Sequence, residues 1–128
     1  MLKTLNPVTV APPFSAYSHA VEVSPGARML FVSGQLGVAP DGSVSEDFAD
    51  QADQAFRNVL AILAEAGMAA HDLVRVNTYL TDSADIAAYR EARDRHLARH
   101  AAASTMIVIS ALAQPQFRIE VEAVAAKA

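Results

Sequence analysis

Two glutamates near the end of the chain, Glu120 and Glu122, have the clearest potential for chemistry. They lie in the segment RIEVEAVA, residues 118–125, where they alternate with apolar residues. In a β-strand successive side chains point to opposite faces, so both carboxylates would share one face and the apolar residues the other. A carboxylate is costly to bury unless it is paired or has a function. The pattern therefore predicts either a functional site or a solvated face on which Arg118 and Glu120 form an exposed pair.

Other chemically active residue types carry weaker signals. His96 and His100 are four residues apart, but a third ligand and an intervening glutamate are missing, so we expect no metal site. Ser33 lies in VSGQ, which is not a G-x-S-x-G nucleophile motif. The chain has no cysteine, which excludes a thiolate nucleophile and a cysteine-ligated zinc. We predict that the protein works without a metal or a cofactor.

The composition narrows the class of protein and of partner. A length of 128 residues predicts one domain, residues 1–128. The formal net charge of -4 lacks the excess of Lys and Arg that nucleic-acid binders carry. The sequence has no run approaching the ~18 apolar residues of a membrane span, and the N-terminal segment has no apolar signal core. We expect a cytoplasmic protein with neither a nucleic-acid nor a membrane partner.

The segments that must position these residues follow one another in a clear order. Strand patterns occupy residues 18–23, 28–36, 73–80, 105–109 and 117–125. The first helix is predicted to start at an N-cap on Ser45 and to stop at Gly67. A second helix, capped by Asp82 or Ser83, is predicted over residues 84–99.

The order β-β-α-β-α-β-β indicates an α+β fold with a mixed, mainly antiparallel sheet and two helices packed on one face. The first two strands, joined by the turn at residues 24–27, are expected to form a hairpin, and so are the last two. Residues 105–109, TMIVI, are apolar on both faces, so the face without helices needs a cover. A second copy of the chain in a closed assembly is the expected cover, and Glu120 and Glu122 would then face a boundary between copies.

Five segments, in order over residues 6–125, resemble the RidA family, also called YjgF or endoribonuclease L-PSP. These segments are AYSHAV (16–21), FVSGQLG (31–37), DQAFRNVLAILAEAG (53–67), VRVNTYLTD (74–82) and IEVEAVA (119–125). The resemblance implies a chorismate-mutase-like fold and a homotrimer that binds a small-molecule metabolite in three clefts between subunits. It also implies hydrolysis of enamine and imine intermediates, such as 2-aminoacrylate, to a 2-keto acid and ammonia.

The resemblance assigns roles to individual residues. Glu120 matches the catalytic glutamate that orients the attacking water and relays a proton. Tyr17 matches a tyrosine at the edge of the cleft. Ser33 and Gly34 match a strand in which close backbone approach leaves room for the ligand.

The arginine that anchors the substrate carboxylate in the family's deaminases is absent. Its position falls on Ser104 when counted from the terminal E-x-E-A motif, and on Ala103 when counted from the pair Ser104–Thr105. Ser104 and Thr105 are therefore expected to line the cleft without supplying a guanidinium, the group best suited to a carboxylate.

Two arginines could replace the missing anchor. Arg90 falls where many family members have a cleft asparagine, and Arg118 is the second candidate. The alternative is that Arg90 pairs with Asp94, four residues on, along a solvated helix face.

Two classes of function remain open. The first is a deaminase-like hydrolase that acts poorly on 2-aminoacrylate, because the anchor is absent. The second is a binding or protective protein that holds a small metabolite without turnover.

Overall fold

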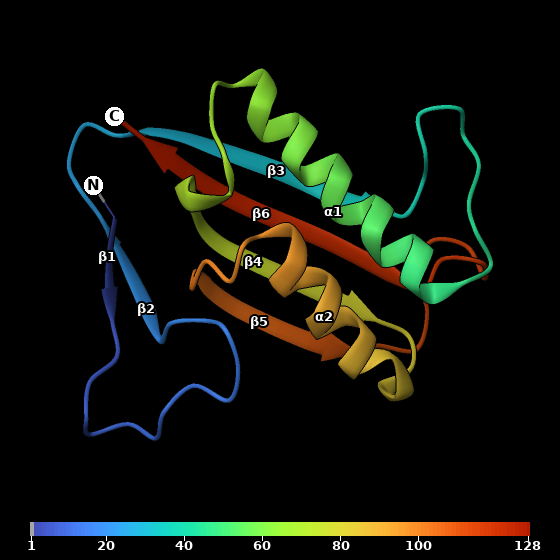
Figure 1. The fold of residues 1–128 in the computed structure, drawn as a ribbon, viewed down its shortest axis with the longest axis horizontal. Coiled ribbons are helices and arrows are strands. Elements are labelled where there is room, and N and C mark those ends of the chain that lie inside the picture. The colour runs from blue at the N-terminus through green and yellow to red at the C-terminus, as the bar shows by residue number, and fades with distance from the viewer. Residues whose placement is uncertain (1) are drawn as a thin grey trace.

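A four-stranded sheet with two helices on one face forms the centre of the molecule (Figure 1). The structure, a computed structural model, describes residues 2–128. Its elements are β1 (Leu2–Leu5), β2 (Ala20–Val23), β3 (Arg28–Leu36), α1 (Phe48–Glu65), β4 (Leu73–Leu80), α2 (Ile86–His96), β5 (Ala103–Val108) and β6 (Ile119–Lys127), with 3-10 turns at Ala70–Asp72 and Ser83–Asp85. Within residues 2–128, neither helix has the length and apolar character needed to cross a membrane.

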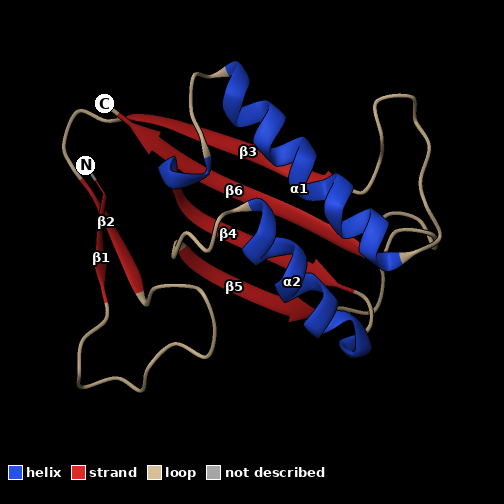
Figure 2. Cartoon of the chain, viewed as in Figure 1, coloured by secondary structure: helices blue, strands red, loops and turns tan. Residues whose placement is uncertain are grey.

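The strands of the central sheet lie in the order β3-β6-β4-β5 (Figure 2). The pairs β3–β6 and β6–β4 are antiparallel, whereas β4 and β5 are parallel. Parallel neighbours need a crossover connection, and α2 supplies it. The predicted α+β class with a mixed, mainly antiparallel sheet and two helices on one face is confirmed.

Both predicted hairpins are wrong. β2 pairs with β1 rather than with β3, and the two form a separate antiparallel sheet in which Leu2 lies opposite Val23. Residues 2–5 can pair in this way because the prolines of the N-terminal segment begin only at Pro7. At the other end of the chain, β6 inserts between β3 and β4, so β5 and β6 are not neighbours. The central position gives β6 a hydrogen-bonding partner on each edge.

The core lies between the helices and the sheet. On the side of α1 that faces the sheet, six apolar residues are buried, namely Phe48, Ala52, Ala55, Phe56, Val59 and Leu63. The alternating residues of β6 that meet them are also buried, namely Ile119, Val121, Ala123 and Ala125. Each fully buried large apolar side chain stabilises the fold by about 1.5–3 kcal/mol, so this layer fixes which face of β6 points at the helices.

The N-cap of α1 differs from the prediction. Asp47, not Ser45, caps the helix, because its carboxylate accepts a hydrogen bond from the Ala49 amide at 3.2 Å. Ser45 supports the cap from outside, since its hydroxyl accepts from the Asp47 amide at 3.1 Å and donates to Asp50 at 3.0 Å. At the other end Gly67 has a φ of 70°, so the predicted glycine stop is confirmed.

The second helix is shorter than predicted. Asp82 accepts a hydrogen bond from the Ala84 amide at 2.9 Å and so caps a 3-10 turn, after which α2 begins at Ile86. The helix ends at His96, because Ala98 and Arg99 adopt φ values of 50° and 56° in the left-handed region.

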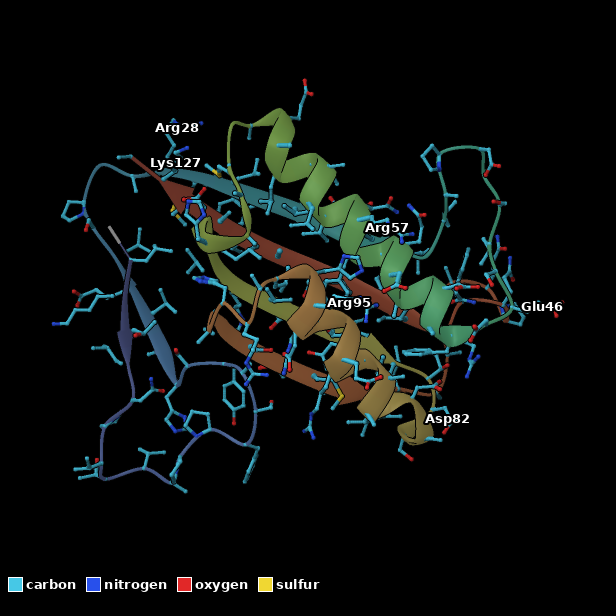
Figure 3. The ribbon with its side chains drawn as sticks, in the orientation of Figure 1. Arg28, Glu46, Arg57, Asp82, Arg95 and Lys127 are labelled. Atoms are coloured by element: carbon cyan, nitrogen blue, oxygen red, sulfur yellow. The ribbon has the colours of Figure 1, made fainter. Side chains whose placement is uncertain are left out.

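Asp53 joins the two helices. Its carboxylate, on α1, accepts hydrogen bonds from the His96 ring at 2.8 Å and from Arg95, both on α2. Figure 3 labels Arg95 on this helix. The His96 ring also stacks on Phe56, with centroids 6.0 Å apart. Partial burial raises the pKa of Asp53, but the hydrogen bonds from His96 and Arg95 outweigh it, and the pKa lies below its ordinary value of 3.8.

Replacing this carboxylate, Asp53→Asn, is expected to lower the free energy of unfolding by about 1 kcal/mol near pH 7. Because the pKa of Asp53 is lowered in the folded state, its stabilising effect is present above the unfolded pKa and is lost as pH falls through the folded pKa. Urea denaturation at several pH values should show the gap between wild type and variant closing below pH 3.8. The exposed Glu65→Gln serves as the control, and a gap of equal size at all pH values would contradict the assignment.

Candidate functional site

Five of the predicted site residues line two cavities, whereas Gly34 and Glu120 line neither. We call the first the edge pocket; it has a volume of about 330 Å³ and is lined by Phe14, Ser15, Tyr17, Tyr89, Arg90, Arg93, Ser104, Thr105 and Met106. We call the second the open-face hollow; it has a volume of about 310 Å³ and is lined by Phe31, Val32, Ser33, Arg75, Asn77, Glu122, Ala123 and Val124. The edge pocket therefore collects Tyr17, Arg90, Ser104 and Thr105, whereas the hollow collects Ser33.

The edge pocket lies beside β5, where α2 and the loop before β2 meet the last strand of the sheet. The helix supplies Tyr89 and two arginines, and β5 supplies two hydroxyl side chains. The loop is tied to the strand because the Ser18 amide donates to the Ala102 carbonyl at 3.0 Å and Ser18 forms a bridge with Ala103. This tie holds Tyr17 at the pocket wall.

The edge pocket is cationic. Arg93 is only 5% exposed and lies over the Tyr89 ring at 5.5 Å. Its guanidinium donates to Asp94 at 3.0 Å and to the Ser15 hydroxyl at 3.4 Å. Arg90 is exposed and forms no ion pair with any residue between 2 and 128. With two guanidinium groups, five hydroxyl side chains and no carboxylate in its lining, the pocket suits an anionic ligand.

The pair between Arg90 and Asp94, the alternative to a ligand-binding role, is not formed. The Asp94 carboxylate instead receives Arg93 at 2.9 Å and Arg99 at 3.1 Å. Tyr89 also lines the pocket, and its hydroxyl is buried without a hydrogen-bond partner in the described part of the chain. Sequence reasoning missed Arg93 and Tyr89, although Arg93 follows Arg90 by three residues and so shares its side of a helix.

Arg118 lies outside both places. Its guanidinium donates to both carboxylate oxygens of Asp85, at 3.0 and 2.9 Å, and packs over the Phe48 ring at 5.3 Å. The exposed pair of Arg118 with Glu120 is therefore not formed, and Arg118 ties the start of β6 to the helical layer.

Glu120 lies half-buried on the sheet face that the helices leave uncovered, and it packs against Gly34. The register of β3 on β6 shifts between Val32 and Gln35, so β3 carries a bulge there. A Cβ atom on Gly34 would come within 2.2 Å of the Glu120 carboxylate. The close backbone approach predicted at residue 34 thus makes room for Glu120 itself.

The open-face hollow contains a polar network that centres on Glu122. Its carboxylate accepts hydrogen bonds from the Tyr79 hydroxyl at 2.7 Å and from the Asn77 amide at 3.4 Å. The hydrogen bond to Glu122, followed by burial and the charges of Glu122 and Glu120, raises the pKa of Tyr79. Across the hollow, Arg75 donates to the Thr105 hydroxyl at 3.0 Å.

Sequence reasoning assigned no role to the polar residues of β4. Arg75, Asn77 and Tyr79 alternate along the segment RVNTY, and a strand places alternate residues on one face. That spacing was the available signal, because it predicts a polar row on the sheet face that the helices do not cover.

The two histidines four residues apart point to different partners. His96 contacts Asp53, whereas the His100 ring lies 2.8 Å from the Leu73 carbonyl oxygen. Among residues 2–128, His, Asp and Glu side chains form no group of three that could hold a metal ion.

The fold and the site define a class. Two helices on one face of a β3-β6-β4-β5 sheet, with polar hollows at the edge and on the other face, form a small α+β domain of the chorismate-mutase-like type. A sequence model of the endoribonuclease L-PSP family matches residues 8–127, and the chain belongs to this family, also called RidA or YjgF. The predicted family and fold are thereby confirmed.

Individual relatives agree with this placement. The crystal structure of YyfB from Yersinia pestis, described as a protein of unknown function of the Rid family, superposes with a TM-score of 0.87 at 32% identity over 97% of each chain. A RutC family protein of Aquifex aeolicus is 47% identical over 77 residues, which are 59% of this chain and 56% of that protein.

A third relative carries a functional name. The Escherichia coli protein named "Putative reactive intermediate deaminase TdcF" is 33% identical over 104 residues, covering 77% of this chain and 79% of that protein. Its crystal structure with bound serine superposes with a TM-score of 0.74 at 28% identity over 96% of this chain and 94% of that one.

The contact between Gly34 and Glu120 gives a specific prediction. Gly34→Ala should push the Glu120 carboxylate away, because the added methyl group overlaps its position. The free energy of unfolding should fall by only about 1 kcal/mol, since the clash is with the end of a flexible side chain. A crystal structure of the variant and a thermal melt would check both effects. Ser33→Ala, at the exposed neighbouring position, is the control, and an unmoved Glu120 in Gly34→Ala would contradict the prediction.

Proposed function

We propose that the protein is a RidA-like homotrimer that binds a small carboxylate-bearing metabolite in its edge pockets, where it hydrolyses an enamine or imine group. The observation that carries the proposal is the lining of the edge pocket, in which Arg90 and Arg93 meet hydroxyl groups and no carboxylate. The relative TdcF, named as a reactive intermediate deaminase and solved with bound serine, supports a small ligand of this kind.

The reaction needs three groups in place. A carboxylate anchor holds the substrate, a water molecule adds to the imine carbon, and a proton-transferring group assists the addition and the release of ammonia. Addition of water gives a carbinolamine, whose C–N bond breaks as the nitrogen takes up a proton, leaving a 2-keto acid and ammonia. In this proposal Arg90, which has no competing ion pair, takes the carboxylate, and Arg93 holds the pocket wall in place through Asp94 and Ser15.

The proton-transferring group would come from a neighbouring copy. Within one chain Glu120 is not part of the edge-pocket lining but lies on the open sheet face. That face exposes large apolar side chains, with Phe31 75% and Ile107 45% exposed. Packing the edge pocket of one copy against the open face of the next would cover this apolar surface and bring Glu120 to the pocket.

Activity on 2-aminoacrylate is expected to be low, because no guanidinium stands at Ala103 or Ser104. A second function, binding without turnover, is favoured by one observation, the separation of Glu120 from the pocket within a single chain. The two functions share the ligand and differ in whether keto acid is released.

Keto-acid release distinguishes them. Purified protein mixed with freshly generated 2-aminoacrylate and with several 2-imino acids should accelerate the hydrolysis of at least one of these compounds. Glu120→Gln should slow that reaction by about 10²–10⁴-fold, the usual contribution of a general acid-base group. Arg90→Gln should raise KM more than it lowers kcat, because it removes a binding contact.

The exposed Arg57→Gln on α1 removes the same charge far from β5 and is the matched control (Figure 3). If wild type never exceeds the spontaneous rate but a keto acid raises its melting temperature in an Arg90-dependent manner, the binding function holds. If neither effect is found, the proposed function is wrong.

Sedimentation analysis tests the assembly on its own. The protein should sediment as a trimer of the 13.6 kDa chain. Phe31→Glu should shift it toward monomer, because a charge would be buried against a neighbouring copy. If the wild-type protein sediments as a monomer, no neighbouring copy supplies Glu120 to the edge pocket, and the proposed assembly is wrong.

A further inference from the structure

Two side chains that line the edge pocket are buried and carry polar atoms without a hydrogen-bond partner. Tyr89 is 1% exposed and Arg93 is 5% exposed. The Tyr89 hydroxyl and the Nη2 nitrogen of Arg93 make no hydrogen bond within residues 2–128. Arg90 and Thr105, which line the same pocket, are exposed. We call Tyr89 and Arg93 the buried end of the edge pocket, and Arg90 and Thr105 its mouth.

The group missing from the buried end must be a hydrogen-bond acceptor, because a guanidinium has donors only. In Arg93, Nε donates to Asp94 at 3.0 Å and Nη1 donates to the Ser15 hydroxyl at 3.4 Å. Nη2 lies 2.9 Å from Asp94 but is not aligned for a hydrogen bond. Since this nitrogen carries two hydrogens, at least one of them has no acceptor. A buried donor without an acceptor is unfavourable, so a ligand that brings an acceptor is favoured.

The Tyr89 ring is held in place before a ligand arrives. It stacks on Phe56, with ring centroids 6.4 Å apart and an interplanar angle of 22°. The Arg93 guanidinium lies over the same ring, 5.5 Å from its centroid. A donor on a ring that is already fixed loses little conformational freedom when a ligand binds to it.

The charges beside the pocket favour a carboxylate as the acceptor. Asp94 is the ion-pair partner of both Arg93 and Arg99, so one carboxylate balances two guanidinium groups. Arg90 adds a third guanidinium, which forms no ion pair within residues 2–128. Positive charge is therefore in excess here, and it attracts a negatively charged acceptor more strongly than a neutral one.

We propose that the edge pocket selects a ligand with two carboxylates, a 2-imino dicarboxylate or the corresponding keto acid. Its 2-carboxylate binds Arg90 at the mouth. Its second carboxylate accepts hydrogen bonds from the Tyr89 hydroxyl and from Arg93 at the buried end. Because Arg90 is taken as the anchor, this specificity rests on the proposed function and adds to it the chemistry of the far end of the substrate.

The pocket discriminates against a ligand that has an apolar group in place of the second carboxylate. Such a group would cover both donors of the buried end and leave them unpaired, and sites built for hydrogen bonding reject ligands of this kind. The volume of about 330 Å³ lies at the small end of ligand pockets, which suits a chain of about four or five carbons. One chain builds the buried end by itself, so the selectivity does not depend on a residue from a neighbouring copy.

The test compares two stable keto acids of similar shape on the full-length wild-type protein. 2-Oxoglutarate and 5-methyl-2-oxohexanoate share the 2-keto-acid end, and they differ in a terminal carboxylate against an isopropyl group. Isothermal titration calorimetry should give 2-oxoglutarate a Kd that is lower by about tenfold or more, because only this ligand pairs the buried donors. Equal affinities, or weaker binding of 2-oxoglutarate, would overturn the proposal without any variant being made.

Tyr89→Phe tests the hydroxyl alone, because it keeps the ring and its stacking. The variant should bind 2-oxoglutarate about tenfold more weakly and 5-methyl-2-oxohexanoate as tightly as wild type. Without ligand it should melt at the same temperature as wild type or higher, since a buried hydroxyl without a partner is removed. Unchanged affinity for 2-oxoglutarate, or a lower melting temperature that reveals a partner within the protein, would overturn the proposal.

Thr78→Val is the matched control. The Thr78 hydroxyl is also buried without a partner within residues 2–128, but Thr78 lies on β4 and does not line the edge pocket. Both affinities should therefore stay at the wild-type values. A loss for 2-oxoglutarate equal to that in Tyr89→Phe would show a general effect of removing buried hydroxyl groups and would overturn the proposal.

Arg90→Gln separates this inference from the proposed function. It should weaken the binding of both keto acids by a similar factor, because both present the same carboxylate to the mouth. If both bind in an Arg90-dependent manner with equal affinity, the edge pocket keeps its proposed function and only the selectivity for a second carboxylate is wrong. If neither binds in an Arg90-dependent manner, the proposed function and the selectivity are both wrong.

Discussion

The alternation of β6 is the constraint on which the rest of the structure depends. Burial of its four apolar residues beneath the helices leaves Glu120 and Glu122 no position other than the opposite face. Because β6 is an inner strand of the sheet, its two carboxylates have a neighbouring strand on each side, β3 and β4. Packing of the helices on one face of the sheet therefore places the two carboxylates together on the opposite face.

The two hollows show how one small sheet can present different electrostatic environments. At the edge, α2 brings Arg90 and Arg93 beside β5, and no acidic residue lines the cavity between them. On the open face β4 and β6 stand in register so that the neutral donors Asn77 and Tyr79 lie opposite the carboxylates, Asn77 opposite Glu122 and Tyr79 opposite Glu120. Thr105 belongs to the edge pocket and also holds Arg75, so it links the two environments across the parallel pair β4–β5.

Local sequence patterns predicted the positions of the helices and strands well, but they did not predict which strands pair with each other. β3 and β4 match the predicted residues 28–36 and 73–80, because alternation and flanking turn residues are local signals. The two predicted hairpins are wrong because the partner of a strand depends on the whole sheet. The spacing of residues along the sequence does not indicate that β6 inserts between β3 and β4. The N-cap of α1 is Asp47 and not the predicted Ser45, and the sequence could not decide between them because several residues that favour N-caps follow one another there.

The site could be predicted only in part. Tyr17, Arg90, Ser104 and Thr105 line one pocket, and their role in ligand binding stays a prediction, as does the catalytic role of Glu120. Arg75 was missed because its importance comes from neighbours on other strands rather than from a motif.

The bulge in β3 restricts how this segment can change in length. Two residues, 33 and 34, lie opposite one residue of β6, and the pairing then resumes with Gln35 opposite Val121. Deleting one of them would leave a single residue opposite Glu122 and keep Gln35 opposite Val121, so the bulge would be lost while the pairing on both sides of it is preserved. An insertion would place three residues of β3 opposite one of β6, so the segment 33–34 should not tolerate a longer chain, whereas the exposed turn around Gly42, which follows β3, is free to vary in length.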